Sequence, residues 1–500
     1  MTTSPVVSHA VVVGAGIAGL AAARALARGG VRVTVLEGSP QVGGKLRVGE
    51  IAGLPVDEGA ESMLARRPEG LDLVRDLGRS GDLVNPGTTS SAILSRGALR
   101  RIPSGQVMGV PSDLRALASS QVLSPAGLAR VPLDLVLPGT PRDADVSVAA
   151  FIGARLGREV VDRLVEPLLG GVYAGRADEL SFESTLPGVA TAARGHRSLI
   201  TAVQGVRRAA PANPGPVFAT LPGGLGTLPH LLAADLDAAG ASVRTGTTVR
   251  ELRRRADGWR LTLGPARAPE YLDADAVLVA VPAAPASRLL GFEVPAAARE
   301  LAGIEYASMA IVTLVFPAAA FPRFPKGSGY LVPTVENEAR GSDVKAVTFS
   351  SVKWPHLRER DPALIAVRAS IGRFGEERTL QRTDEELVAA ARAELAGTCG
   401  VTGAPAATRV SRWGGGLPQY TVGHAGRVAR IHAAVARQPG LAVAGAAYEG
   451  VGVPACVASA HAAAARVLDH LRSPEHARAR EGANHVSDGT GGQAEGPRTQ

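Results

Sequence analysis

The sequence predicts an α/β protein of several domains, in which a βαβ unit suited to dinucleotide binding is joined to a mixed sheet and a helical insertion. Three observations support this prediction. A glycine-rich turn separates an apolar strand from a helix close to the N-terminus. Residues 88–216 contain amphipathic stretches separated by prolines, which is typical of short helices. Residues 285–410 contain alternating apolar runs, which indicate strands of a second sheet.

Composition and charge narrow the class of protein. The chain has 500 residues, of which 45% are apolar and 20% charged, so it is long enough for several globular domains. The net charge of +8 favours anionic partners, but no basic run is interleaved with aromatic residues, so a nucleic-acid partner is not expected. Cys399 and Cys456 are far apart and form no CxxC pair. They predict neither a disulfide framework nor a metal site, and they favour a reducing cytoplasm.

The N-terminal unit carries the strongest motif. Residues 10–13 are expected to form a strand, followed by a helix to about residue 28 and a second strand over 31–36. Gly14, Gly16 and Gly19 form a GxGxxG motif between the first strand and the helix. The first glycine permits a tight turn, the second lets the backbone approach a pyrophosphate, and the third lets the helix pack on the sheet. Glu37 ends the second strand, where a carboxylate can accept hydrogen bonds from a ribose.

Two further segments favour FAD over NAD as the dinucleotide. The second strand is followed by Ser39–Lys45 (SPQVGGK), and a glycine pair at this place is typical of flavin-binding proteins and generally absent from NAD enzymes. Lys45 or Arg47 is expected to meet the anionic diphosphate. Near the C-terminus, an apolar strand over 441–446 leads into Tyr448–Pro454 (YEGVGVP) and the start of a helix. The dipole of that helix would stabilise a negatively charged reduced flavin.

Several longer segments identify a family. They are Pro167–Gly175 (PLLGGVYAG) with Leu180–Ser181, Leu221–Leu225 (LPGGL), Trp413 with Leu417–Tyr420 (LPQY) and Gly423–His424, and Tyr448–Pro454. With these segments in order, the chain to about residue 472 resembles the oxygen-dependent porphyrinogen oxidases of haem synthesis, which are amine-oxidase-like flavoproteins. The segment Val56–Ser62 (VDEGAES) is similar to one that passes beside the flavin ring in amine-oxidase-like flavoproteins.

The resemblance implies an amine-oxidase-like architecture, with a Rossmann-type FAD-binding domain, a mixed-sheet substrate domain and a helical insertion. The FAD-binding domain is expected to be discontinuous and to contain residues 1–87, 217–284 and 411–472. Residues 88–216 would form the helical insertion, and residues 285–410 the substrate-binding sheet domain. Residues 473–500 contain few apolar side chains and are expected to form a disordered tail.

The resemblance also implies which residues line a non-covalently bound FAD. They are Gly14, Ala15, Gly16, Ile17, Ala18, Gly19, Glu37, Gly38, Lys45, Gly59, Ala60, Glu61, Ser62, Val249, Trp413, Val451, Gly452 and Val453. No residue is assigned as a catalytic base, and His196 and His424 are interpreted as structural. Neither the family nor the sequence indicates a metal.

The implied activity is the FAD-dependent oxidation of a porphyrinogen to a porphyrin in successive two-electron steps, with molecular oxygen as the acceptor. Coproporphyrinogen III carries more propionates than protoporphyrinogen IX. It is the favoured substrate because the chain is basic and looks most like the soluble forms of Gram-positive bacteria. The expected partners are the porphyrinogen and oxygen. Product hand-over to a ferrochelatase and peripheral membrane contact are further candidates.

Three alternatives stay open. The chain could oxidise protoporphyrinogen IX, it could be an amine oxidase or a carotenoid desaturase, or it could be a flavoprotein that binds without catalysing. An amine oxidase often has an aromatic cage, and only 4% of the residues here are aromatic. A desaturase is expected to have a more apolar insertion. A non-catalytic flavoprotein would hold FAD and consume no oxygen.

Recognition of the propionates is the point at which the chain departs from the family. Eukaryotic members carry an arginine in the strand that corresponds to Ser90–Ala92, and this arginine is thought to contact a propionate. Arg96, Arg100 and Arg101 follow in this chain. They could either replace that arginine or form a solvated basic turn.

Overall fold

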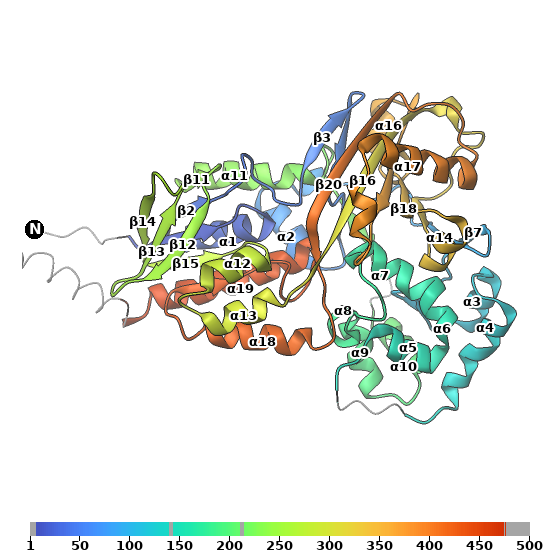
Figure 1. The fold of residues 1–500 in the computed structure, drawn as a ribbon, viewed down its shortest axis with the longest axis horizontal. Helices are drawn as coiled ribbons and strands as arrows, with labels where there is room; N and C mark the ends of the chain where they lie inside the picture. The colour runs from blue at the N-terminus through green and yellow to red at the C-terminus, as the bar shows by residue number, and fades with distance from the viewer. Residues whose placement is uncertain (1–6, 140–143, 211–214, 475, 477–500) are drawn as a thin grey trace, which may run out of the picture.

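The computed structural model describes residues 7–139, 144–210, 215–474 and 476. Figure 1 shows a molecule with three parts. A parallel sheet with its helices forms one end, and at the other end a second sheet lies beside a group of short helices. These parts are called the parallel-sheet domain, the mixed-sheet domain and the helical insertion below.

The parallel-sheet domain is built around strands that all run in the same direction. Their order is β11 (Ser242–Arg244), β2 (Arg32–Leu36), β1 (His9–Val13), β15 (Ala276–Val279) and β21 (Leu441–Val443). The chain passes from β1 to β2 on one side of the sheet and places β15 on the other side of β1. The carboxyl ends of β1 and β15 therefore flank a topological switch point, which is where open α/β sheets bind ligands.

Helices cover one face of the parallel sheet. They are α1 (Ile17–Arg28), α2 (Pro68–Asp76), α11 (Leu228–Ala238) and α19 (Val453–Leu471). Both α1 and α19 are rich in alanine, and the small side chains let these helices pack closely against each other. The other face is covered by three helices and a small antiparallel sheet. These are α12 (Ala283–Leu290), α13 (Pro295–Ala302), α18 (His424–Val435), β12 (Val249–Arg254), β13 (Trp259–Leu263) and β14 (Glu270–Ala274).

The mixed-sheet domain contains a second sheet. Its order is β20 (Ala407–Pro418), β16 (Tyr306–Pro317), β19 (Leu364–Ile371), β18 (Val344–Phe349), β17 (Gly329–Leu331), β6 (Ala92–Ser95) and β7 (Ala98–Arg101). Alternate residues such as Val312 and Val367 pack with helix α17 (Asp384–Cys399). Residues of the opposite face, such as Val315, pack on the hairpin of β3 (Val48–Ile51) and β4 (Leu54–Asp57). One face therefore holds the domain's own core, and the other meets the parallel-sheet domain.

Shorter elements complete the two sheet domains. They are β5 (Met63–Leu64), β10 (Phe218–Ala219), α14 (Thr334–Arg340), α15 (Ser350–Lys353) and α16 (Pro355–Arg360). The helical insertion contains β8 (Gln106–Val107), β9 (Val110–Pro111), α3 (Leu114–Ser120), α4 (Pro125–Arg130), α5 (Val148–Leu156), α6 (Arg158–Val160), α7 (Glu166–Tyr173), α8 (Phe182–Thr185), α9 (Pro187–Arg194) and α10 (Leu199–Ala209). A π-helical turn over Val161–Val165 joins α6 to α7. The insertion has its own apolar core, in which Phe151 stacks on Phe182 at 4.2 Å between ring centres.

The structure corrects three of the predicted domain boundaries. Strands β6 and β7, placed by prediction in the helical insertion of 88–216, extend the mixed sheet because β6 pairs in parallel with β17. Helices α12 and α13, placed by prediction in the sheet domain of 285–410, pack instead on the parallel sheet. Strand β20 crosses the predicted boundary between 410 and 411 without interruption. In each case the partner that decides the domain is distant in sequence.

Two predicted segments fall mostly outside the described residues. They are residues 211–214 of the predicted helical insertion and most of the predicted disordered tail of 473–500. Within the described part of the chain, no helix is both long and apolar enough to cross a bilayer.

Candidate functional site

The GxGxxG turn lies at the carboxyl end of β1, next to the switch point. Gly14 has φ +104°, and a Cβ there would lie 2.7 Å from the carbonyl oxygen of Ala280 after β15. A Cβ on Gly19 would collide with the carbonyl oxygen of Gly14, so α1 packs on the turn only because this residue is glycine. Gly16 precedes α1 with open space where its Cβ would be. The open first turn of α1 thus presents unpaired N–H groups to an anion.

Neighbouring residues of this turn contribute backbone and core contacts. Ala15 and Ala18 are buried with their methyl groups in the core, whereas Ile17 is half-buried. Gly43 of the predicted glycine pair donates its N–H to the carbonyl of Ala15 at 2.8 Å. The SPQVGGK segment therefore closes over the turn, as its expected role requires.

Glu37 lies one strand away, at the carboxyl end of β2. Its carboxylate accepts the N–H of Ala15 at 2.7 Å and the N–H of Ser39 at 2.9 Å, one on each oxygen. Each oxygen keeps further lone pairs for the hydroxyl groups of a ribose. Gly38 is exposed, and a Cβ there would approach Thr248, the residue before β12. Val249 at the start of β12 is half-buried, so the predicted residues Gly38 and Val249 both lie near the end of β2.

Lys45, Gly59 and Trp413 meet at the junction of the two sheet domains. A Cβ on Gly59 would collide with the carbonyl oxygen of Lys45 and would lie 3.1 Å from the indole of Trp413. The indole donates to the carbonyl of Glu58 at 2.8 Å. The ammonium of Lys45 lies 5.5 Å from the ring centre of Tyr306. Burial lowers the pKa of Lys45, and an anion placed beside it would favour its charged form.

The C-terminal loop brings the start of α19 to the same edge. Gly445 after β21 lies close to Ala18 in α1. Gly452 is exposed and caps α19, Val451 is half-buried, and Val453 is buried at the first helical position. The N-terminus of α19 therefore adds a second set of unpaired N–H groups near the turn of α1.

Glu61 is directed toward the mixed-sheet domain. Its carboxylate accepts the ammonium of Lys353 at 2.6 Å and a guanidinium N–H of Arg368 at 2.7 Å. Arg368 also donates to the carbonyl of Gly59. Burial alone would raise the pKa of Glu61, but the charges of Lys353 and Arg368 outweigh it and lower the pKa to about 2. Ala60 is exposed and Ser62 half-buried, so their predicted contact with the flavin stays a prediction.

Sequence reasoning missed two residues of this site. Arg368 interrupts the apolar strand LIAVRASI, and one charge within a buried strand is a signal that could have revealed it. Tyr306 starts β16, lies under Lys45 and accepts the N–H of Ala283 at 2.9 Å. Nothing in the local sequence distinguishes Tyr306 from a core tyrosine.

An aromatic row links the helical insertion to the C-terminal loop. Tyr173 of α7 lies 5.5 Å from Tyr420, which stacks on His424 at 3.9 Å between ring centres. The hydroxyl of Tyr420 donates to the carbonyl of Ala446 at 2.7 Å and accepts the N–H of Gly450 at 2.7 Å. These contacts fix the loop before α19 and account for the LPQY and PLLGGVYAG segments. Burial lowers the pKa of His424, whose ring bonds to a backbone carbonyl, and this agrees with a structural role.

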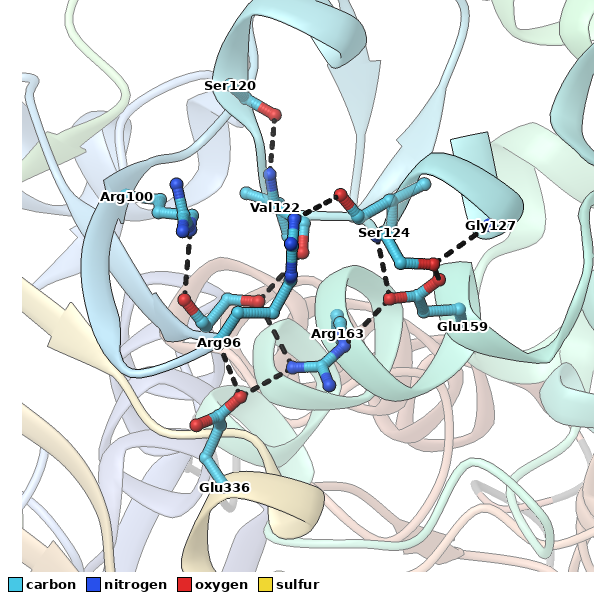
Figure 2. Close-up of polar contacts among 11 residues, drawn as sticks. Arg96, Arg100, Ser120, Val122, Ser124, Gly127, Glu159, Arg163 and Glu336 are labelled. Carbon is cyan, nitrogen blue, oxygen red and sulfur yellow. Dashed lines mark hydrogen bonds and ion pairs between the residues drawn. The ribbon is translucent and has the colours of Figure 1, made fainter. Parts of the chain in front are cut away.

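Figure 2 shows two of the arginines considered for propionate binding. Arg96 donates to the carbonyl of Leu123 at 3.0 Å, and Arg100 donates to the carbonyl of Ser95 at 2.9 Å. Arg100 also donates to the side-chain oxygen of Gln121 at 2.8 Å, so both arginines join the β6–β7 hairpin to the helical insertion. Arg101 is exposed on β7. Arg96 and Arg100 thus have hydrogen-bond partners within the protein, and propionate binding by any of the three arginines stays a prediction.

The residues at the edge of the parallel sheet fit a flavin dinucleotide. Gly16 leaves a cradle that any Cβ would begin to fill, and two helix N-termini face it. The hydroxyl of Tyr448 is buried without a hydrogen-bond partner among the described residues. It belongs to the YEGVGVP loop beside that cradle. A dinucleotide with an extended ring system matches this combination of anion site and polar, aromatic loop.

Comparison with known proteins identifies the family. Residues 17–468 match the flavin containing amine oxidoreductases. The chain belongs to this family. A flavin is accordingly its cofactor, and the prediction of a flavin-dependent oxidoreductase with an amine-oxidase-like fold is confirmed.

Individual relatives carry more specific names. The flavoprotein is 37% identical to coproporphyrinogen III oxidase of Propionibacterium freudenreichii subsp. freudenreichii, over 92% of this chain and 91% of that protein. It is 34% identical to coproporphyrinogen III oxidase of Bacillus subtilis (strain 168), over 93% and 99%. A solved structure from Exiguobacterium sp. 255-15, provisionally named a protoporphyrinogen oxidase, superposes with a TM-score of 0.79 and 32% identity over 92% of this chain and 98% of that one. The predicted resemblance to porphyrinogen oxidases is therefore confirmed.

Proposed function

We propose that this flavoprotein oxidises coproporphyrinogen III to coproporphyrin III in haem biosynthesis, with FAD as cofactor and molecular oxygen as acceptor. The observation that carries the proposal is the similarity to coproporphyrinogen III oxidases over nearly the whole chain, the parallel-sheet domain and the helical insertion included. The LPQY and PLLGGVYAG segments form the aromatic row that joins these two parts.

When bound, FAD would supply the two-electron redox chemistry that links oxidation of the porphyrinogen to reduction of oxygen. The chain supplies the binding and orientation. The first turn of α1 binds the diphosphate, Glu37 binds the ribose, and Lys45 adds positive charge. Trp413, Gly59 and the start of α19 hold the ring system, and the α19 dipole favours negative charge on it. The mixed-sheet domain and the helical insertion enclose the substrate and exclude water.

The proposal is tested by supplying each porphyrinogen separately to the purified yellow protein in air. Porphyrin fluorescence is followed against the spontaneous rate, and FAD-free protein serves as the control. Faster turnover of coproporphyrinogen III supports the proposal. Faster turnover of protoporphyrinogen IX would assign the other substrate, and no oxidation of either above the spontaneous rate would contradict a porphyrinogen oxidase.

We propose further that FAD is bound non-covalently. Cys456 lies in the first turn of α19. Its thiol is 3.8 Å from the carbonyl oxygen of Gly450 and 4.0 Å from that of Val451. Burial raises the pKa of Cys456 to about 11, so the thiol is protonated at neutral pH and is a poor nucleophile. Acid precipitation should leave all yellow colour in the supernatant, and colour retained in the pellet would contradict this.

The remaining partners are also proposals. The small number of cysteines supports a location in the reducing cytoplasm. Contact with a membrane surface is supported by the segment of Leu133, Leu135 and Val136 in the helical insertion, whose residues are 48%, 41% and 72% exposed. Product hand-over to a ferrochelatase stays a prediction.

A further inference from the structure

A small cavity lies where the parallel-sheet domain meets the mixed-sheet domain. Its volume is about 10 Å³, and its wall includes Asp57, Glu61, Thr220, Ser350, Trp354 and His356. The first three belong to the parallel-sheet domain, and the last three belong to the segment of α15 and α16 in the mixed-sheet domain, with Trp354 between the two helices. We call it the junction cavity. Any molecule inside it touches both domains.

Two polar atoms at the junction cavity lack partners. Thr220 is 1% exposed, and its hydroxyl has no hydrogen-bond partner among the described residues. The same holds for Nδ1 of His356, a buried ring atom. A buried polar group without a partner costs about 1–3 kcal/mol, so native proteins rarely leave one unsatisfied. Two such atoms on one cavity, contributed by two domains, indicate a polar ligand.

The cavity also contains hydrogen-bond acceptors that are already in place. Asp57 accepts the N–H groups of Leu225 at 3.0 Å and Gly226 at 2.8 Å, and its two oxygens keep further lone pairs. Glu61 accepts hydrogen bonds from the cations of Lys353 and Arg368 and from the hydroxyl of Ser350, the last at 3.4 Å. A cavity of this size holds about one water molecule, which needs two to four polar partners. The volume is too small for an organic ligand.

We infer that the junction cavity is the binding site of one structural water, which bonds to the Thr220 hydroxyl, His356 Nδ1 and a carboxylate of Asp57 or Glu61. The water joins the two sheet domains beside the Gly59–Ser62 segment. Its position there makes it a support for the flavin crevice. The inference goes beyond the proposed function and holds for any substrate.

The inference is tested by whether removal of the Thr220 hydroxyl lowers or raises the thermal midpoint. Thr220→Val keeps the shape of the side chain and removes the hydroxyl. If the water is present, the variant deprives it of a partner, and the thermal midpoint of the FAD-loaded full chain falls by several degrees. If the cavity is dry, the variant removes an unsatisfied buried hydroxyl, and the midpoint stays or rises. Thr220→Ser is the matched control, because it keeps the hydroxyl and should restore most of the midpoint after the loss of one methyl group.

A double-mutant cycle and a crystal structure give independent readouts. Thr220 and His356 share no direct hydrogen bond, so a ligand that bonds to both would couple their contributions. Thr220→Val combined with His356→Leu should therefore lower the midpoint by less than the sum of the single changes. A crystal structure of the FAD-loaded chain should show one density peak within hydrogen-bond distance of both atoms. Additive changes, or a cavity without density, would overturn the inference.

Discussion

Glu61 connects the Gly59–Ser62 segment, which is predicted to line the flavin, to the mixed-sheet domain. Its partners lie 292 and 307 positions away in the sequence. Its side chain is 11% exposed, and those of Lys353 and Arg368 are 13% and 7% exposed. A carboxylate in such a place is stable only while both cations remain. Arg368 has the additional task of holding the carbonyl of Gly59. The ion pair of Glu61 and Arg368 therefore helps to fix the position of the Gly59–Ser62 segment.

Removal of Arg368 is expected to cost both stability and flavin affinity. Arg368→Met leaves Glu61 partly unpaired, and we expect the free energy of unfolding to fall by about 3 kcal/mol. The Gly59 carbonyl also loses its donor, so the dissociation constant of FAD should rise. Urea unfolding of the FAD-free protein measures the first effect, and flavin fluorescence titration measures the second. Arg194→Met is the control, because its ion pair with Glu183 is exposed and should contribute under about 1 kcal/mol. Equal losses in the two variants would contradict this role for Arg368.

Asp57 and Glu61 change the stability of the folded state with pH in opposite directions. Burial raises the pKa of Asp57 to about 6. The hydrogen bonds from Gly226 and Leu225 and the charge of Arg368 lower this pKa, but burial outweighs them. The folded state therefore binds this proton more tightly than the unfolded chain, whose aspartate pKa is about 3.9. The stabilisation is complete below about pH 4 and is lost as the pH rises to about 6. Glu61, with its lowered pKa of about 2, contributes stability above about pH 4.3 that is lost as the pH falls toward 2.

The Asp57→Asn variant separates the two effects. Between pH 4 and pH 7, the free energy of unfolding of the wild type should fall by about 2 kcal/mol relative to the variant, which has no proton to lose at this position. The amide also loses one acceptor for Leu225 or Gly226, but that cost does not change with pH. Urea unfolding at several pH values measures the slope. Parallel curves for wild type and variant would show that the Asp57 pKa is not raised.

At the scale of elements, α1 and its turn perform two tasks with different glycines. Gly19 serves packing, because its Cα lies against the carbonyl of Gly14. Gly16 is not required by the fold, because the space beside it is open and its φ of −71° suits any residue, so its predicted task is to bind the ligand. The two tasks can therefore be separated by the same substitution at two positions.

We expect Gly19→Ala to lower the thermal midpoint of the FAD-free protein, since the added methyl group forces α1 away from the sheet. Gly16→Ala should leave that midpoint within a degree or two, because the fold has room for the methyl group. The same methyl group would occupy the space of the diphosphate, so the affinity for FAD should fall at least about tenfold, or 1.4 kcal/mol. Calorimetry and flavin titration of both variants check these outcomes. Unchanged FAD affinity in Gly16→Ala would place the diphosphate elsewhere.

At the scale of the whole molecule, the sequence predicts what is local and misses what depends on distant partners. The turn of Gly14, Gly16 and Gly19 could be predicted because each glycine acts within a few residues. The β6–β7 hairpin has a readable turn at Gly97, but its sheet is decided by parallel pairing with β17, far along the chain. The pairing of Glu61 with Arg368 is equally remote. Family resemblance supplied the architecture that local patterns left open.

The helical insertion gives the last prediction, on how the whole molecule meets a membrane. Asp134 is fully buried, pairs with Arg155 and accepts the hydroxyl of Ser198 at 2.6 Å. This anchor fixes the turn that displays Leu133, Leu135 and Val136 to solvent. Arg197 donates to the carbonyl of Leu135 and is itself exposed, so positive charge lies beside the apolar segment. Apolar side chains flanked by cations favour the surface of an anionic bilayer.

We expect the full chain to float with phosphatidylglycerol vesicles in a density gradient and to stay behind with phosphatidylcholine vesicles. Leu135→Glu with Val136→Glu should abolish flotation, because two charges would have to enter the interface. Both residues are exposed, so the folded state should tolerate the change. Phe292→Glu is the matched control: Phe292 is 73% exposed in the turn between α12 and α13, which pack on the parallel sheet, and its loss should leave flotation unchanged. Flotation that survives the double change, or that is lost equally in Phe292→Glu, would show that this segment does not bind the membrane.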